Sequence, residues 1–414
     1  MRMAFVPPGP ISLSVRDKGH SSIDAPHKYL SAYGLKPQAT AVWSLFRPCI
    51  YVNDRLLMSL FDENRPNQIS PTAGAKQPFE LWCTLLETAI QTPSPHNVQP
   101  WRIRLVSERE AKLFIDRKRT LPKEDTTGSF ILSAMGMFVE AIALLAAPRG
   151  FSLVYELSHP PEWYAKTILD EEKTDLLPFA NLQLSPCSPL ENPYPAALFL
   201  RRRTSRIPLL PNPVEDAAVA ALANLATQWG QRYEQITDSE KIESVLTRNI
   251  DALFEDLNSR GYHDEIVAWF RFTDRAAKRH RDGLDWRCMN TSRTAFWLAA
   301  RWPKLLVLPV ASSLLRRQYR RQLGLVPTIG LLSGDFFRAS SAFEVGRFLI
   351  RFWLETARLG LYIHPYGNLV TNPSAAHWLT GITQIKDIWL IFKIGHSEAP
   401  PQSYRRSLAE VMTS

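Results

Sequence analysis

The stretch 92–101, T-P-S-P-H-N-V-Q-P-W, combines residues whose types and spacing could hold a ligand. Each of its three prolines fixes φ and pushes the preceding residue toward an extended backbone. The backbone N–H groups of Ser94, His96 and Asn97 therefore cannot all join a regular ladder, and another group must satisfy them. A planar heterocycle with donors and acceptors along its edge is one candidate. An ordinary proline-rich turn before an edge strand is the alternative.

A second stretch, 198–206, reads L-F-L-R-R-R-T-S-R and is suited to binding an anion. Guanidinium groups pair bidentately with phosphate oxygens, and a threonine hydroxyl adds a neutral donor. The functional interpretation is therefore a phosphate site. The alternative is a solvated basic face, which is the common fate of an isolated cluster of arginines.

Simple patterns predict the elements that position the first stretch. Residues 78–91 have apolar residues at helical spacing, and the prolines that follow should end that helix. Residues 101–106 alternate apolar and basic side chains as a half-buried strand does, and 111–116 can follow as the hairpin partner. The stretch 92–101 is then a rigid connector between a helix and a hairpin.

Both stretches resemble signatures of the FMN-dependent nitroreductase superfamily. P-S-P-H-N-V-Q-P-W is similar to the superfamily's P-S-S-x-N-x-Q-P-W, although Pro95 replaces the commoner serine and removes one N–H and one hydroxyl. A strand, a D-R-x-R-x-L-P segment at 116–122 and a small-residue helix over 133–147 follow it, as in many members. R-R-T-S-R is similar to the R-R-S-x-R that opens nitroreductase domains and grips the FMN phosphate.

The closer resemblance is to the Acg-like subfamily, in which one internally duplicated chain imitates the usual homodimer. It covers 79–412 and implies an α+β fold of two degenerate, pseudo-twofold-related repeats, each a mostly antiparallel sheet flanked by helices. The expected divisions are an N-terminal arm at 1–76, a first repeat at 77–197, and a second repeat at 198–414 with a basic, apolar lid insertion at about 272–324.

The order of the two motifs implies how many flavins one chain binds. In a standard subunit the arginine motif precedes the proline motif, and two subunits each lend one motif to a shared site. Here the proline motif comes first, and no second copy of either motif accompanies it. Each half has thus kept one complementary part, so one chain suffices for one flavin site and dimerisation is left open.

The resemblance also implies which residues contact FMN. The proline motif and the turn after Gly360 would flank the ring, whereas the arginine motif and the C-terminal P-P-Q-S-Y-R-R at 400–406 would hold the phosphate. Arg271 would face the N1 edge of the ring, and His364 is expected to pack locally instead of acting as an acid. The implied cofactor-binding residues are Pro93, Ser94, Pro95, His96, Asn97, Gln99, Arg202, Arg203, Thr204, Arg206, Arg271, Pro365, Tyr366, Gly367, Arg405 and Arg406.

The sequence shows no nucleophile set, carboxylate pair or metal-ligand cluster, so no catalytic residue and no metal are predicted. Hydride transfer through a flavin asks little of side chains. The implied function is an FMN-dependent NAD(P)H oxidoreductase that passes hydride through flavin N5 to a nitroaromatic, a quinone or an unknown small-molecule acceptor. The alternatives are an FMN-binding or storage protein without turnover and a peripheral membrane flavoprotein.

The insertion carries an unusual charge. Residues 271–321 hold thirteen lysines and arginines against three aspartates. Within them, 296–315 approaches the length of a membrane span, but its basic residues and prolines oppose insertion. Two interpretations remain: a lid over the flavin, as the resemblance implies, or an interfacial helix in which 296–321 contacts an anionic membrane surface.

Bulk properties limit the other classes. The chain has 414 residues, 45% of them hydrophobic, which is long enough for two domains or one large duplicated core. A net charge of +9 favours an anionic partner, but the sequence has no helix-turn-helix, zinc or RNP pattern, so nucleic acid is not expected. Four scattered cysteines and a start without a secretory pattern predict a cytoplasmic protein, unless it lies at the membrane periphery.

Overall fold

The computed structural model describes residues 79–169, 175–302 and 308–413. The chain divides into two units, Met1–Gly74 and Ala75–Ser414, and the described residues all belong to the second. The N-terminal arm predicted at 1–76 therefore lies outside the described residues, as does part of the apolar stretch 296–315.

Four antiparallel strands form the sheet of the first half. They are β1 (Trp101–Leu105), β2 (Glu110–Asp116), β3 (Phe151–Leu157) and β4 (Leu176–Pro186), in the spatial order β1-β2-β4-β3. β1 and β2 pair directly, with Trp101 opposite Ile115, which confirms the predicted hairpin. β4 is an interior strand and has a hydrogen-bonded partner on each side.

A second antiparallel sheet forms the other half. Its strands are β5 (Arg232–Ile236), β8 (Ile329–Ser333), β9 (Tyr362–Pro365) and β10 (Ile388–Gly395), in the order β5-β8-β10-β9. β8 and β10 are buried along their whole length, and their continuous apolar runs are typical of fully covered strands. The two sheets confirm the predicted α+β class with antiparallel sheets. A small parallel pair, β6 (Phe270–Arg271) and β7 (Leu284–Asp285), forms a separate two-stranded sheet.

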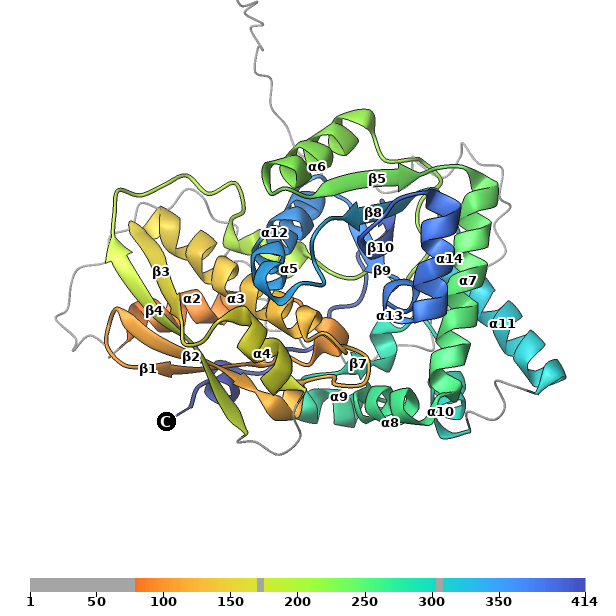
Figure 1. Cartoon of the computed structure of the whole chain (residues 1–414), viewed down its shortest axis with the longest axis horizontal. Helices are drawn as coiled ribbons and strands as arrows, with labels where there is room; N and C mark the ends of the chain where they lie inside the picture. The colour runs from red at the N-terminus through yellow and green to blue at the C-terminus, as the bar shows by residue number, and fades with distance from the viewer. Residues whose placement is uncertain (1–78, 170–174, 303–307, 414) are drawn as a thin grey trace, which may run out of the picture. The chain divides into compact units, whose positions relative to one another are not determined.

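Two long helices join the halves. α3 (Ser129–Ala146) and α12 (Ala339–Arg358) lie side by side at the centre of Figure 1. Their backbones approach so closely that a Cβ added to Gly136 would lie 2.0 Å from the carbonyl oxygen of Phe343, and Gly346 repeats this approach. The two glycines therefore allow one continuous hydrophobic core to include residues of both sheets.

α3 is apolar enough to resemble a membrane helix. Ser129–Arg149 is the one helix among the described residues with the length and hydropathy for a span, and 83% of its apolar window is buried inside the protein. The helix begins before the predicted residue 133 because Asp125 caps it. The Asp125 carboxylate accepts hydrogen bonds from the N–H groups of Phe130 at 3.2 Å and Ile131 at 2.9 Å.

Further helices complete both halves. The first half also contains α2 (Glu80–Ala89), η1 (Pro95–Asn97), η2 (Arg117–Arg119), η3 (Ala147–Arg149), α4 (Pro161–Ile168) and α5 (Ala196–Arg201). The second half also contains α6 (Asp216–Gln228), α7 (Ser239–Asn258), α8 (Arg260–Ala268), α9 (Asp274–His280), η4 (Trp286–Cys288), α10 (Arg293–Arg301), α11 (Pro309–Leu323), α13 (Asn368–Thr371), α14 (Pro373–Thr383) and α15 (Leu408–Val411). α2 ends just before the proline motif, as predicted.

Candidate functional site

A cavity of about 400 Å³ is lined by residues from both halves. The proline motif, the arginine motif, the turn after β9 and the C-terminal segment all contribute to its wall. Asn97 and Arg206, which belong to two distant motifs, therefore face one space. The predicted cofactor-binding residues that line the cavity are Pro93, Ser94, Pro95, His96, Asn97, Arg202, Arg203, Thr204, Arg206, Pro365, Gly367 and Arg405.

The proline motif reaches the cavity as a strained turn. His96, Asn97 and Gln99 have φ angles of 44°, 56° and 53°, in the left-handed region that residues other than glycine rarely adopt. The Ser94 hydroxyl closes the turn by accepting a hydrogen bond from the Gln99 N–H at 2.9 Å. Backbone strain of this kind persists only where the surrounding structure fixes it, and it clusters at functional sites.

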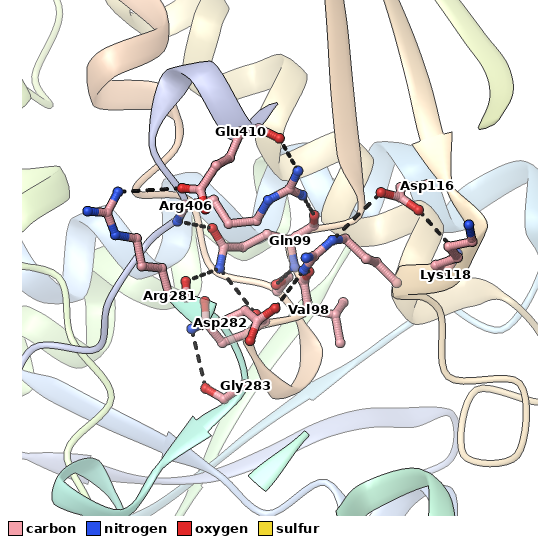
Figure 2. Close-up of polar contacts among 12 residues, drawn as sticks. Val98, Gln99, Asp116, Lys118, Arg281, Asp282, Gly283, Arg406 and Glu410 are labelled. Atoms are coloured by element: carbon pink, nitrogen blue, oxygen red, sulfur yellow. Dashed lines mark hydrogen bonds and ion pairs between the residues drawn. The ribbon is translucent and has the colours of Figure 1, made fainter. Parts of the chain in front are cut away.

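Gln99 and its partners fix this turn (Figure 2). The Gln99 Nε2 donates to the carbonyl of Arg281 at 2.9 Å, and its Oε1 accepts from the N–H of Arg406 at 2.9 Å. The Asn97 carbonyl accepts from the N–H of Gly283 at 3.2 Å. Gln99 and Arg406 do not line the cavity, although both were predicted to bind the cofactor. They instead tie the proline motif to the 281–283 turn and to the C-terminal segment.

Two further predicted residues, Arg271 and Tyr366, also lie away from the cavity wall. The Arg271 guanidinium turns to Asp282, with Nε and Nη2 at 2.9 and 2.6 Å from one carboxylate oxygen. Arg119 donates to the other oxygen at 2.9 Å. Tyr366 is buried in the smaller core cluster around α7 and α13. The ion pair with Asp282 and this apolar packing decide the directions of the two side chains.

The arginine motif extends the edge of the second sheet. Thr204 forms a parallel bridge with Ile363 of the edge strand β9, and the Ser205 N–H donates to the Ile363 carbonyl at 3.0 Å. Asn290 holds the end of the motif through a 3.1 Å hydrogen bond to the Arg206 carbonyl. The motif is thus anchored by its backbone, which leaves its side chains available to the cavity.

Three arginines of the cavity wall have little solvent exposure and no counter-ion in the described chain. Arg202 is buried, and Arg206 and Arg405 are half-buried. Arg202 is 5% exposed, and within the described chain no carboxylate pairs with Arg202, Arg206 or Arg405. Burial lowers the pKa of Arg202 to about 9 and that of Arg405 to about 10, and it also lowers the pKa of Arg206. Buried charges are normally paired. These three guanidinium groups are therefore ready to receive an anion.

A histidine–glutamate pair lines another part of the wall. His96 Nε2 contacts the Glu124 carboxylate, and no described residue bonds to His96 Nδ1. Burial alone would lower the pKa of His96, but the attraction of Glu124 outweighs it and raises that pKa. Burial also raises the pKa of neighbouring Asp125 to about 7. Protonatable groups are thus gathered beside the cavity.

Sequence reasoning missed Glu124 and Asp125 as wall residues. Both line the cavity, and both follow directly after the D-R-x-R-x-L-P segment that ends at Pro122. Their position after that segment was the available signal, but isolated acidic residues after a proline are common in ordinary loops.

His364 lines the cavity in a different electrostatic environment. Burial, together with the positive charges of Arg206 and Lys393, holds the pKa of His364 well below its ordinary value. Lys393 is itself buried, and its Nζ donates to the carbonyl of Ile207 at 2.7 Å. His364 is therefore neutral near pH 7 and is a poor proton donor compared with His96.

Aromatic and aliphatic side chains form an apolar part of the wall. Phe270 of β6, Phe296 of α10 and Leu315 of α11 line the cavity together with Phe254 of α7. The rings of Phe270 and Phe296 lie 4.4 Å apart between centroids. The cavity therefore combines arginines, a polar turn and an aromatic side, which suits a ligand that has an anionic tail and a planar ring system.

Comparisons with known proteins relate the chain to one group of redox proteins. The chain matches no family model. It is 25% identical to "Putative NAD(P)H nitroreductase Rv3131" of Mycobacterium tuberculosis over 187 residues, which are 45% of this chain and 50% of that protein. It is also 25% identical to "Putative NAD(P)H nitroreductase acg" of the same organism over 186 residues, 44% of this chain and 52% of that one. The chain thus spans about half the length of the curated relatives it matches.

Among solved structures, the chain is similar in part to the FMN-dependent nitroreductase NfnB from Mycobacterium smegmatis, determined in complex with NADPH. It shares 15% sequence identity with this chain, covers 51% of this chain and 94% of its own length, and has a TM-score of 0.30. The sequence matches confirm the resemblance carried by the two motifs: this chain is a relative of the Acg-like proteins of the nitroreductase superfamily.

Proposed function

We propose that the chain binds one FMN in this cavity and acts as an NAD(P)H-dependent oxidoreductase on a small acceptor. The observation that carries the proposal is a set of three arginines, the buried Arg202 and the half-buried Arg206 and Arg405, which line the cavity without a carboxylate partner in the described chain. A phosphate dianion would compensate their charge, and guanidinium groups are the side chains best matched to phosphate oxygens.

The residues present fit both parts of FMN. Thr204 adds a hydroxyl to the guanidinium groups for the phosphate. In the proline motif, the buried atoms Asn97 Oδ1 and His96 Nδ1 have no hydrogen-bond partner among the described residues, and a flavin ring offers donors and acceptors along its edge. Buried polar atoms normally find partners, so these two favour a ligand. The volume of about 400 Å³ lies within the range of roughly 300–1,000 Å³ typical of small-molecule sites.

The chain's own residues would bind, shield and supply protons. FMN, when bound, would supply the acceptance and release of hydride at its ring. The arginines would hold the phosphate, and the aromatic side made by Phe254, Phe270 and Phe296 would exclude water from the reacting groups. His96, whose pKa Glu124 raises, would keep a proton beside an acceptor that gains negative charge on reduction.

Both motifs lie in one chain, so a single subunit would suffice for one flavin. NAD(P)H would be the electron donor, and a nitroaromatic or quinone is the class of acceptor that fits an apolar, aromatic cavity wall. We place this activity in the cytoplasm because the chain needs a reduced nicotinamide, with any membrane contact being peripheral.

A second candidate is a protein that holds FMN without turnover. The observation that favours it is the bulk of Phe296, Leu315 and Tyr319, which α10 and α11 add to the cavity wall. If these side chains stay in place when flavin is bound, they would exclude a nicotinamide ring from it.

An absorbance spectrum of the purified full chain, recorded without oxygen before and after addition of NADH or NADPH, separates the two candidates. Flavin bands that bleach with either nucleotide support the oxidoreductase. Flavin bands that persist with both support the holding protein. A colourless chain that gains no flavin band when incubated with FMN would contradict both.

A further inference from the structure

Exposed large apolar side chains gather in one segment of the chain. Twelve such residues are exposed among those the structure describes, and half of them fall within 297–325. These six are Trp297, Trp302, Leu308, Val310, Leu314 and Leu325. The rings of Trp297 and Trp302 contact each other at 5.4 Å between centroids. A gathering of this kind marks an interaction surface more often than single exposed apolar residues do.

Helix α11 carries apolar side chains on two opposite sides. In α11, Leu315 and Tyr319 line the cavity, whereas Val310 is 76% exposed and Leu314 is 62% exposed. In Figure 1, α11 lies at the right edge of the molecule and projects beyond α7. The apolar residues on the inner side of the helix thus form part of the cavity wall. No described residue covers the outer side.

The outer side of α11 continues as a cationic stripe. Val310, Leu314, Arg317 and Arg321 are spaced three or four residues apart along the helix, so the four residues share one face. Both arginines are exposed, and neither has an ion-pair partner within the described ranges. The remaining arginines of the helix are paired with carboxylates of α7. Arg316 pairs with Asp251, and Arg320 pairs with Glu243.

The paired and unpaired arginines of α11 have different roles. The paired arginines fix α11 to the body of the protein. The exposed Arg293 and Arg301 of α10 also lack ion-pair partners in the described chain, so each helix carries unpaired arginines as well as exposed apolar side chains. Exposed tryptophans and aliphatic side chains together with unpaired arginines match the chemistry of a lipid surface that carries negative charge.

We infer that the outer face of α10 and α11, made by Trp297, Trp302, Val310, Leu314, Arg317 and Arg321, docks on an anionic lipid bilayer. α10 has 9 residues and α11 has 15, and both are shorter than the roughly 20 apolar residues that a spanning helix needs. The two helices therefore lie in the interface, with apolar side chains among the acyl chains and arginines at the phosphate level.

Two other occupants are disfavoured by charge. A second copy of this chain would place the same unpaired arginines against each other in an isologous contact, and like charges repel. The N-terminal residues 1–78 carry nine lysines and arginines against five aspartates and glutamates, so their net charge has the same sign as the patch. An anionic bilayer supplies the opposite sign together with an apolar interior.

Docking would also define where the acceptor comes from, and this part rests on the proposed function. The same helices present Phe296 and Leu315 to the cavity and Trp297 and Leu314 to the outside. A docked α10 and α11 would place the bilayer beside the cavity wall. A quinone dissolved in that bilayer is then the acceptor class that the surface selects over a water-soluble nitroaromatic.

Vesicle cosedimentation of the full chain tests the inference. We expect binding to vesicles of phosphatidylcholine with phosphatidylglycerol, weaker binding as salt is raised, and little binding to phosphatidylcholine alone. The variant Val310→Ser/Leu314→Ser should bind the anionic vesicles at least tenfold more weakly, and Arg317→Gln/Arg321→Gln should behave likewise. The matched control Val154→Ser/Leu190→Ser removes similarly exposed apolar residues from the first half and should bind normally.

Absence of binding to the anionic vesicles would overturn the inference, as would equal binding by the test and control variants. Light scattering measures the oligomeric state as a third criterion. A wild-type dimer that Val310→Ser/Leu314→Ser dissociates would make this face an interface between copies and would also overturn the inference. Flavin absorbance of each sample keeps the two proposals apart. A chain that binds vesicles but takes up no FMN would refute the proposed function alone, and a yellow chain that ignores vesicles would refute the docking alone.

Discussion

Arginines of low solvent exposure occur in two settings in this molecule, and the contrast distinguishes residues that hold the fold from residues that await a ligand. Behind the proline motif, Arg119 and Arg271 share the buried carboxylate of Asp282. In the cavity wall, Arg202 is buried and Arg405 is half-buried, but no carboxylate in the described chain reaches them. A paired buried charge is neutralised by the protein itself, whereas an unpaired one is neutralised only when an anion arrives.

The largest expected effect tests the unpaired set. Replacing two of these arginines in Arg202→Ala/Arg206→Ala should weaken FMN binding about a thousandfold, because hydrogen bonds to charged groups contribute about 1.5–3 kcal/mol each. Equilibrium dialysis measures the affinity. The matched control is Arg201→Ala, which removes an exposed arginine next to the motif and should leave the affinity unchanged. Full affinity in the double variant would contradict the site.

The paired set should respond in stability. Asp282→Asn leaves Arg119 and Arg271 without their carboxylate, so the free energy of unfolding should fall by about 3 kcal/mol. Urea denaturation followed by circular dichroism measures it. Asp335→Asn breaks an exposed pair with Arg338 and serves as the control, with an expected loss below about 1 kcal/mol. Equal losses in the two variants would show that the buried carboxylate has no special role.

A third variant sharpens the contrast between the sets. Arg202→Met keeps most of the side-chain volume and removes an uncompensated charge, so the flavin-free protein should change in unfolding free energy by less than about 1 kcal/mol. Added FMN should then raise its melting temperature less than it raises that of the wild type. A flavin-free Arg202→Met protein as unstable as Asp282→Asn would instead assign Arg202 to the fold.

The smallest expected effect concerns pH. Burial would lower the pKa of His96, but Glu124 outweighs it and the pKa lies above the ordinary 6.5. The folded state therefore favours the protonated ring. This contribution to stability is present below pH 6.5 and is lost as pH rises through the raised pKa. Glu124→Gln should flatten that fall in unfolding free energy, and Glu156→Gln, an exposed carboxylate in β3, should not. Parallel slopes in all three proteins would refute the pairing.

The parts of the site that the sequence predicts are those encoded by residue type. Proline fixes backbone angles wherever it stands, and a cluster of arginines attracts anions, so the two motifs could be assigned before their contact was known. The hairpin from Trp101 followed from the alternation of apolar and polar residues, and the α3 helix followed from the family resemblance. The close crossing of α3 and α12 did not, because a glycine such as Gly136 indicates freedom of the backbone without indicating which partner approaches it.

Side-chain direction was beyond the sequence. Gln99 belongs to the proline motif, and both Asn97 and Gln99 have a positive φ. The Gln99 side-chain amide nevertheless hydrogen-bonds to the backbones of Arg281 and Arg406 and does not line the cavity. Arg271 was expected at the flavin edge, but its guanidinium pairs with Asp282 and does not line the cavity. Such outcomes depend on competition between partners that meet only in the folded chain, and no local pattern records that competition.

Calorimetric titration of the flavin-free full chain with FMN and with riboflavin tests the central claim most directly, because the two ligands differ only in the phosphate. We predict one FMN per chain and binding of riboflavin at least a hundredfold weaker, which corresponds to about 2.7 kcal/mol. Equal affinity for the two ligands would contradict the assignment of Arg202, Arg206 and Arg405 to a phosphate.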